Sequence, residues 1–104
     1  MGAGLNRQHG RTSATGTVTV TNVAADATIP NPGFHVNVHP NTLDLIAPAG
    51  NSDAVFFSQT AAAVVNTGVS INPGEMITIA GGTGKLSLVA ASGSQDIDII
   101  AHYA

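Results

Sequence analysis

Apolar residues occupy every second position over much of the last third of the chain, in short runs separated by proline and glycine. This alternation is typical of β-strands that bury one face and expose the other. The expected strands are residues 69–71, 76–80, 85–91 and 96–103. The side chains expected on one wall of a core are Ile77, Ile79, Leu86, Leu88, Ile97, Ile99 and Tyr103. Their neighbours, expected to face solvent or a partner, are Thr78, Ser87, Asp96 and Asp98.

The same pattern occurs earlier in the chain. Residues 15–23 alternate Thr17, Thr19 and Thr21 with Val18 and Val20, and β-branched residues suit a pleated surface. A loop is expected over residues 24–32, and the turn-rich residues 48–52 separate two of the later strands. The further expected strands are residues 33–39 with Phe34, Val36 and Val38 inward, 42–47 with Leu43 and Leu45 buried, 53–58 with Val55, Phe56 and Phe57, and 61–65.

About eight short strands with turn signals every 8–12 residues, and no helical period, predict an all-β fold. We expect an antiparallel β-sandwich of jelly-roll type over residues 15–104. The segment Asn72–Glu75 has proline and glycine where a type II turn needs them, and this turn type splays a tight hairpin. The strands on either side of it are therefore joined by a wider loop or lie in different sheets.

Residues 1–14 are expected to form an N-terminal arm separate from the domain. The segment contains three glycines, one large aliphatic residue after Met1, and two of the three basic residues, Arg7 and Arg11. It has too few apolar side chains to offset the entropy of its own ordering. Two interpretations remain open: a tail without a role, or an arm that orders against a neighbouring subunit, with Arg7 and Arg11 meeting an acidic surface.

Charge and composition narrow the function. Charged residues make up 9 % of the chain, against roughly 25 % in typical soluble domains, and the formal net charge is −3. Three basic residues are too few for general nucleic-acid binding, and the absence of cysteine excludes disulfides and thiolate metal sites. No apolar run approaches the roughly 18 residues of a membrane span. Low charge favours an oligomer or a docked protein, although a plain Thr/Ser-coated domain has the same composition.

No motif or pair of residues in the sequence indicates catalysis or cofactor binding. Residues 81–85 lack the spacing of a phosphate loop and are expected to form a glycine hairpin loop. His35 and His39 share a strand face but lie about 13 Å apart, too far for one metal ion. Asp96 and Asp98 lie about 6.6 Å apart, a separation found in glycoside hydrolases, yet such an enzyme also needs a cleft and aromatic sugar platforms, so a solvated strand face is the favoured interpretation. We expect no enzyme activity, metal or cofactor.

The C-terminal 35 or so residues resemble the small β-sandwich proteins of tailed-bacteriophage particles. The resemblance rests on residues 68–75 (GVSINPGE), the strand 76–80, residues 86–93 (LSLVAASG) and the final strand 97–100. It implies a structural role in the virion, with assembly in the host cytoplasm. The glycine-rich arm with its arginines departs from that pattern and leaves the mode of attachment open.

Two functions are compatible with these observations. The first is a capsid decoration or cement protein, expected as a homo-oligomer and preferably a trimer, whose partner is the major capsid protein or another virion protein. The second is a receptor- or glycan-binding module of a spike or tail fibre, for which Asn31, Asn51, Asn66 and Tyr103 would offer polar contacts. The scarcity of aromatic residues argues against the second function.

Overall fold

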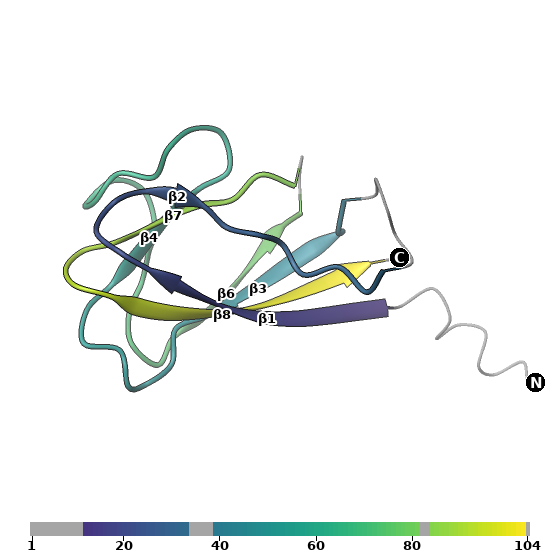
Figure 1. The fold of residues 1–104 in the computed structure, drawn as a ribbon, viewed down its shortest axis with the longest axis horizontal. Coiled ribbons are helices and arrows are strands. Elements are labelled where there is room, and N and C mark those ends of the chain that lie inside the picture. The colour runs from purple at the N-terminus through teal and green to yellow at the C-terminus, as the bar shows by residue number, and fades with distance from the viewer. Residues whose placement is uncertain (1–11, 34–38, 82–83, 104) are drawn as a thin grey trace, which may run out of the picture.

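The computed structural model describes residues 12–33, 39–81 and 84–103, and this part of the chain forms eight β-strands in two sheets (Figure 1). The strands are β1 (Thr12–Val20), β2 (Ala25–Asp26), β3 (Thr42–Ile46), β4 (Val55–Ser58), β5 (Ser70–Ile71), β6 (Met76–Ala80), β7 (Ser87–Ala90) and β8 (Gln95–Tyr103). In the described ranges there is no helix long and apolar enough to cross a membrane. The all-β prediction is confirmed.

The strand order identifies the sandwich as a jelly roll. One sheet has the order β1-β8-β3-β6 and the other the order β2-β7-β4-β5. The chain therefore pairs its first strand with its last, its second with its seventh, and so on inward, as if a long antiparallel hairpin had been wrapped around a core. All ladder pairs are antiparallel.

The turn Asn72–Glu75 carries the chain from one sheet to the other. The Glu75 amide donates to the Asn72 carbonyl at 2.9 Å, and Gly74 has a φ of 84°, as position i+2 of a type II turn requires. Because β5 and β6 lie in different sheets, the crossing between sheets is the correct alternative. The prediction of a glycine hairpin loop at residues 81–85 is wrong, because β6 and β7 also belong to different sheets.

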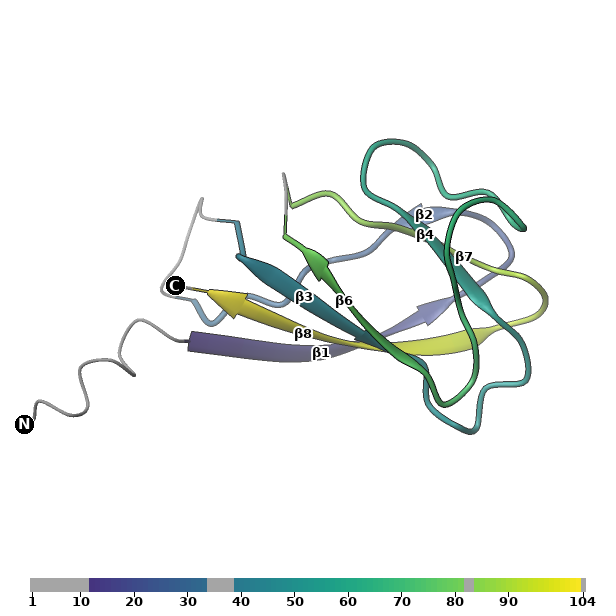
Figure 2. The same ribbon diagram turned by 180° about the vertical axis from the view of Figure 1, so that it is seen from behind.

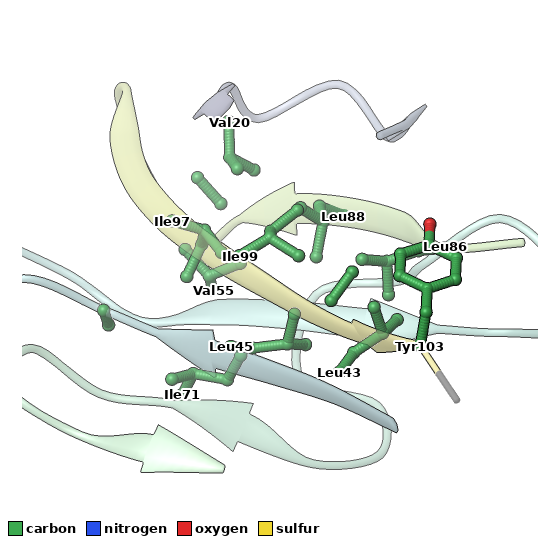
Figure 3. Close-up of a cluster of buried hydrophobic side chains, with 13 residues drawn as sticks. Val20, Leu43, Leu45, Val55, Ile71, Leu86, Leu88, Ile97, Ile99 and Tyr103 are labelled. Carbon is green, nitrogen blue, oxygen red and sulfur yellow. The ribbon is translucent and has the colours of Figure 1, made fainter. Parts of the chain in front are cut away.

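The main core lies between the two sheets, where side chains from both point toward one another (Figure 3). The predicted inward residues Leu43, Leu45, Leu86, Ile97 and Ile99 are all fully buried. Further buried members of this cluster are Val20, Ala47, Val55, Ile71, Leu88, Ala90, Ala101 and Tyr103. The alternation in the sequence thus identified the core correctly, because a half-buried strand must place apolar residues on one face.

A second, smaller cluster covers the outer side of the sheet β2-β7-β4-β5. It contains Phe56, Ala63 and Val89, so β7 is buried on both faces. Ser87 was expected to face outward but is 1 % exposed, and its hydroxyl accepts the Ala63 amide at 3.0 Å. The predicted strand at residues 61–65 is therefore wrong. Those residues are a covering loop, which fastens to Ser87 instead of pairing in a ladder.

The N-terminal boundary differs slightly from the expected one. Strand β1 begins at Thr12, and Thr12, Ser13 and Ala14 pair with the end of β8, which extends to Tyr103 and provides partners for them. Residues 1–11 of the predicted arm and most of the predicted strand 33–39, including Phe34, Val36 and Val38, lie outside the described residues. The expected loop at residues 24–32 contains the two-residue strand β2.

Candidate interaction face

The outer face of the sheet β1-β8-β3-β6 includes the two longest strands of the described residues, β1 and β8, and Figure 2 shows its four strands side by side. Alternation sends one set of side chains into the core and the other set outward. The outward set is Ser13, Thr15, Thr17, Thr19, Thr42, Asp44, Ile46, Met76, Thr78, Ala80, Asp96, Asp98, Ile100 and His102. The face contains threonines, three carboxylates, one histidine and three large apolar side chains.

Threonines on β1 hold the two aspartates of β8. Thr17 lies opposite Asp98 in the ladder and Thr19 lies opposite Asp96. The Thr17 hydroxyl donates to Asp98 Oδ1 at 2.7 Å, and the Thr19 hydroxyl donates to Asp96 Oδ1 at 3.4 Å. Each carboxylate retains a second oxygen and further lone pairs, so both can accept bonds from a partner while their orientation is constrained.

Asp44 forms the centre of a second polar group on this face. It accepts from the Thr78 hydroxyl at 2.6 Å and lies 2.9 Å from His102 Nε2. These contacts join three strands, because Asp44 is on β3, Thr78 on β6 and His102 on β8. The hydrogen bond from Thr78, followed by that from His102, lowers the pKa of Asp44 below its usual 3.8. The carboxylate is therefore ionised at neutral pH.

Apolar side chains lie between these polar groups. In the ladder register Ile46 pairs with both Asp98 of β8 and Met76 of β6, while Ile100 pairs with Asp44. Ile46 and Ile100 are half-buried, and Met76 is 58 % exposed. Interface cores are depleted in charge and enriched in methionine, whereas their rims are polar. On this face the apolar side chains lie toward the β6 edge, because Met76 begins the edge strand β6 and Ile46 ends β3, and ordered acceptors adjoin them.

The chemistry that the face can support is recognition. In the described part of the chain there is no cluster of three or more histidine, cysteine or acidic residues that could hold a metal ion. No buried side-chain polar atom among those residues lacks a hydrogen-bond partner. The carboxylates and hydroxyls of the face bond to one another across strands, so a partner meets a surface whose side chains are already ordered and loses less entropy on binding.

The structure describes some, but not all, of the charged and histidine residues considered in the sequence analysis. Asp96 and Asp98 do share an outward strand face, as predicted. His39 is exposed and lies close to Gly84, where an added Cβ would be 2.5 Å from His39 Nδ1. Arg7, Arg11 and His35 lie outside the described residues, so the arm contact of the two arginines stays a prediction.

The glycine-rich segment and its lysine have structural contacts. Gly81 is packed so closely that a Cβ there would lie 1.8 Å from the Pro40 carbonyl oxygen. The Lys85 ammonium pairs with the Asp26 carboxylate at 3.0 Å, with both side chains largely in solvent. An exposed pair of this kind contributes little to stability.

The sequence analysis missed the group formed by Asp44, Thr78 and His102. Asp44 and His102 are 58 residues apart, and nothing in the local pattern relates them. The sequence signal that was available is alternation along the strand. Asp44 lies between the buried Leu43 and Leu45, and His102 lies between the buried Ala101 and Tyr103, so both side chains point outward. Which outward residues meet depends on strand order, and that order is not visible in the pattern.

Comparisons with known proteins assign no family. No protein-family model matches the chain, and a search of curated proteins found no match. Among solved structures, a chain described in work on Bacillus endospore appendages, a family of disulfide-linked pili, aligns with a TM-score of 0.47 and 13 % identity. The alignment covers 90 % of this chain and 86 % of that one. The strand order by itself defines the class, a small all-β jelly roll.

Proposed function

We propose that this chain is a structural protein of a virion, which decorates or cements a phage capsid by protein–protein contacts and so stabilises the particle. The observation that carries the proposal is the outer face of the sheet β1-β8-β3-β6, where Ile46, Ile100 and Met76 lie next to ordered threonine and aspartate side chains. The resemblance of residues 68–100 to phage particle proteins supports the choice of particle.

The face suits a protein surface better than a small molecule. Recognition of a compact ligand usually requires a concave pocket lined with apolar and aromatic groups. The outward residues here lie on four neighbouring strands of one sheet and include no aromatic ring other than His102. A flat surface of this type gains binding free energy by excluding water over a broad area.

In the proposed role the chain needs neither catalysis nor a cofactor. The partner is the major capsid protein or another virion protein, and copies of the chain associate with each other, with a closed trimer as the favoured arrangement. Cyclic association would bury apolar surface that a domain of 104 residues leaves exposed. Membranes and nucleic acids are not part of the proposal.

The first prediction tests this face. Replacing Met76 by lysine puts a charge beside Ile46 on this face, and we expect binding of the full chain to purified expanded phage heads to weaken about tenfold, since burying an unpaired charge costs more than 1.4 kcal/mol. The matched control is Val69→Lys, because Val69 is equally exposed, at 55 % against 58 %, but lies outside the outward set of this sheet. Co-sedimentation with the heads measures both variants.

Two results would contradict the proposal. If the wild-type chain did not co-sediment with the phage heads, the capsid would not be its partner. If Met76→Lys and Val69→Lys weakened binding equally, the outer face of the sheet β1-β8-β3-β6 would not be the binding surface. If the wild-type chain instead bound an array of immobilised glycans, the receptor-binding function would replace the proposed one.

A further inference from the structure

Strand β1 is the longest edge strand in the described part of the chain, and Pro30 packs against it at Gly16. It is the first strand of its sheet and pairs along its whole length with β8 on one side. Natural edge strands are kept from pairing with other chains by being short, charged, bulged or interrupted by proline. In the described part of the chain, β2 and β5 are edges of two residues each, whereas β1 has nine residues, TSATGTVTV, without charge or proline.

A groove runs along this edge. It has a volume of about 510 Å³ and lies between residues 15–19 of β1 and residues 26–30, with Val18, Ala27 and Pro30 as its apolar lining. The segment after β2 runs back along the side of the molecule where β1 forms the edge (Figure 1). The groove therefore offers both the backbone of an edge strand and an apolar wall, which are the requirements for adding a strand.

The wall of the groove is held in place at one end. An added Cβ at Gly16 would be 3.2 Å from Pro30 Cγ, so strand and segment are in close contact there. The Tyr103 hydroxyl donates to the Pro30 carbonyl at 2.7 Å. These contacts tie the segment to β1 and to the end of β8, so the groove exists before any occupant arrives and the entropic cost of forming it is already met.

Charge indicates what the groove binds. Asp26, which pairs with Lys85, lies in its wall, and two of the three threonines of β1 that line it, Thr17 and Thr19, bond to Asp98 and Asp96. Residues 1–11 contain two of the three basic residues of the chain and no acidic residue, whereas all six acidic residues follow Thr12. The segment before β1 and the surroundings of the groove thus have opposite charge, which favours their association.

We infer that residues 1–11 of one copy bind in the β1 groove of a second copy, adding a strand to the edge of its sheet. Leu5 would supply the apolar contact with the wall, and Arg7 and Arg11 would pair with the carboxylates beside the groove. Eleven residues span up to about 36 Å when extended, which exceeds the roughly 30 Å length of a nine-residue strand. The segment is therefore long enough to leave its own copy and lie along a neighbour. This self-association goes beyond attachment to a particle and does not depend on the capsid.

The test uses two full-length variants that lose complementary halves of the contact. Arg7→Glu combined with Arg11→Glu reverses the charge of the segment and leaves the groove intact. Thr28→Arg places a long cationic side chain on the groove wall and leaves the segment intact. By sedimentation velocity we expect the wild-type chain to be an oligomer and each variant alone to be a monomer. An equimolar mixture of the two should form a heterodimer, because the intact segment of one meets the intact groove of the other.

Thr67→Arg is the matched control. Thr67 is an exposed threonine outside any strand, as Thr28 is, but it lies in the loop between β4 and β5, away from the groove lining. This variant should sediment as the wild type does. Thermal unfolding of all variants identifies any loss of folding, since surface substitutions away from special features usually change stability by less than about 0.5 kcal/mol.

A peptide measurement keeps the inference falsifiable if Thr28→Arg does not fold. A labelled peptide of residues 1–11 should bind the full-length double-glutamate variant, and amide chemical shifts should change at residues 15–19 and 26–30. A peptide with both arginines replaced by glutamine should bind about tenfold more weakly, as expected for the loss of two exposed ion pairs. A monomeric wild-type chain, an unchanged oligomer in the double-glutamate variant, or peptide-induced shifts elsewhere would each overturn the inference.

Discussion

At the scale of single residues, the surface of this protein is more ordered than its composition indicates. The side chains of exposed threonines and aspartates usually rotate freely. Here hydrogen bonds across strands join Thr17 to Asp98 and Thr78 to Asp44. Cross-strand pairs of this kind contribute roughly 0.2–1 kcal/mol each. They also orient the carboxylates before a partner binds, which is a property of an interface.

Asp44 provides a prediction at this scale. Its pKa in the folded state is lowered, chiefly by the bond from Thr78, so ionised Asp44 favours folding above the ordinary carboxyl pKa of 3.8. That contribution disappears as the pH falls below 3.8 through the lowered value. Urea unfolding should show wild type more stable than Asp44→Asn at pH 6, with the difference shrinking toward pH 3. A difference independent of pH would contradict this account.

At the scale of elements, the turns determine the topology. Except for the connection between β4 and β5, every connection between consecutive strands of the described fold passes from one sheet to the other. A tight turn can do this when its geometry splays the flanking strands, as the type II turn at Asn72–Glu75 does. The Glu75 carboxylate reinforces that turn by accepting the Asn72 amide at 2.9 Å.

Gly74 allows this turn to be tested. Its φ of 84° is strained for any residue with a side chain, although a Cβ would meet no atom within 4 Å. Gly74→Ala should therefore lower the free energy of unfolding by about 1–2 kcal/mol through backbone strain alone.

Gly50→Ala is the control for that measurement, because Gly50 has equal space and no positive φ. Its effect on the urea midpoint should be neutral or slightly stabilising, since alanine restricts the unfolded chain. Equal effects at the two positions would show that the conformation of Gly74 is not what the turn requires.

At the scale of the whole molecule, stability depends on contacts between segments far apart in the chain. The first strand pairs with the last, and the core joins residues from β1 to β8. Folding must therefore close long loops before the core can form, and folds dominated by such non-local pairing fold in milliseconds to seconds.

Leu45 tests the core at this scale. It is fully buried and its strand, β3, pairs with both β6 and β8. Leu45→Ala should cost about 2–5 kcal/mol of unfolding free energy, from lost burial and the cavity left behind. Val64→Ala, at a side chain 57 % exposed, should change the urea midpoint little. A small effect at Leu45 would mean that the core closes around the cavity.

The order of polar and apolar residues by itself determined much of this protein. Alternation depends on the two-residue period of a strand, so it identified the longer strands, the buried side chains such as Leu43 and Ile99, and the outward direction of Asp96 and Asp98. The type II turn followed likewise from the conformational limits of proline and glycine. These features are local, and local chemistry specifies them.

Only the tertiary structure determined which strands, and therefore which side chains, are neighbours. The burial of Ser87, the covering loop at residues 61–65, the pairing of Asp44 with His102 and the groove beside β1 all depend on strand order. Period-two patterns state whether a side chain points inward or outward but not which strand lies next to it. Neighbours are selected by packing of the complete core, and that information is distributed over the whole chain.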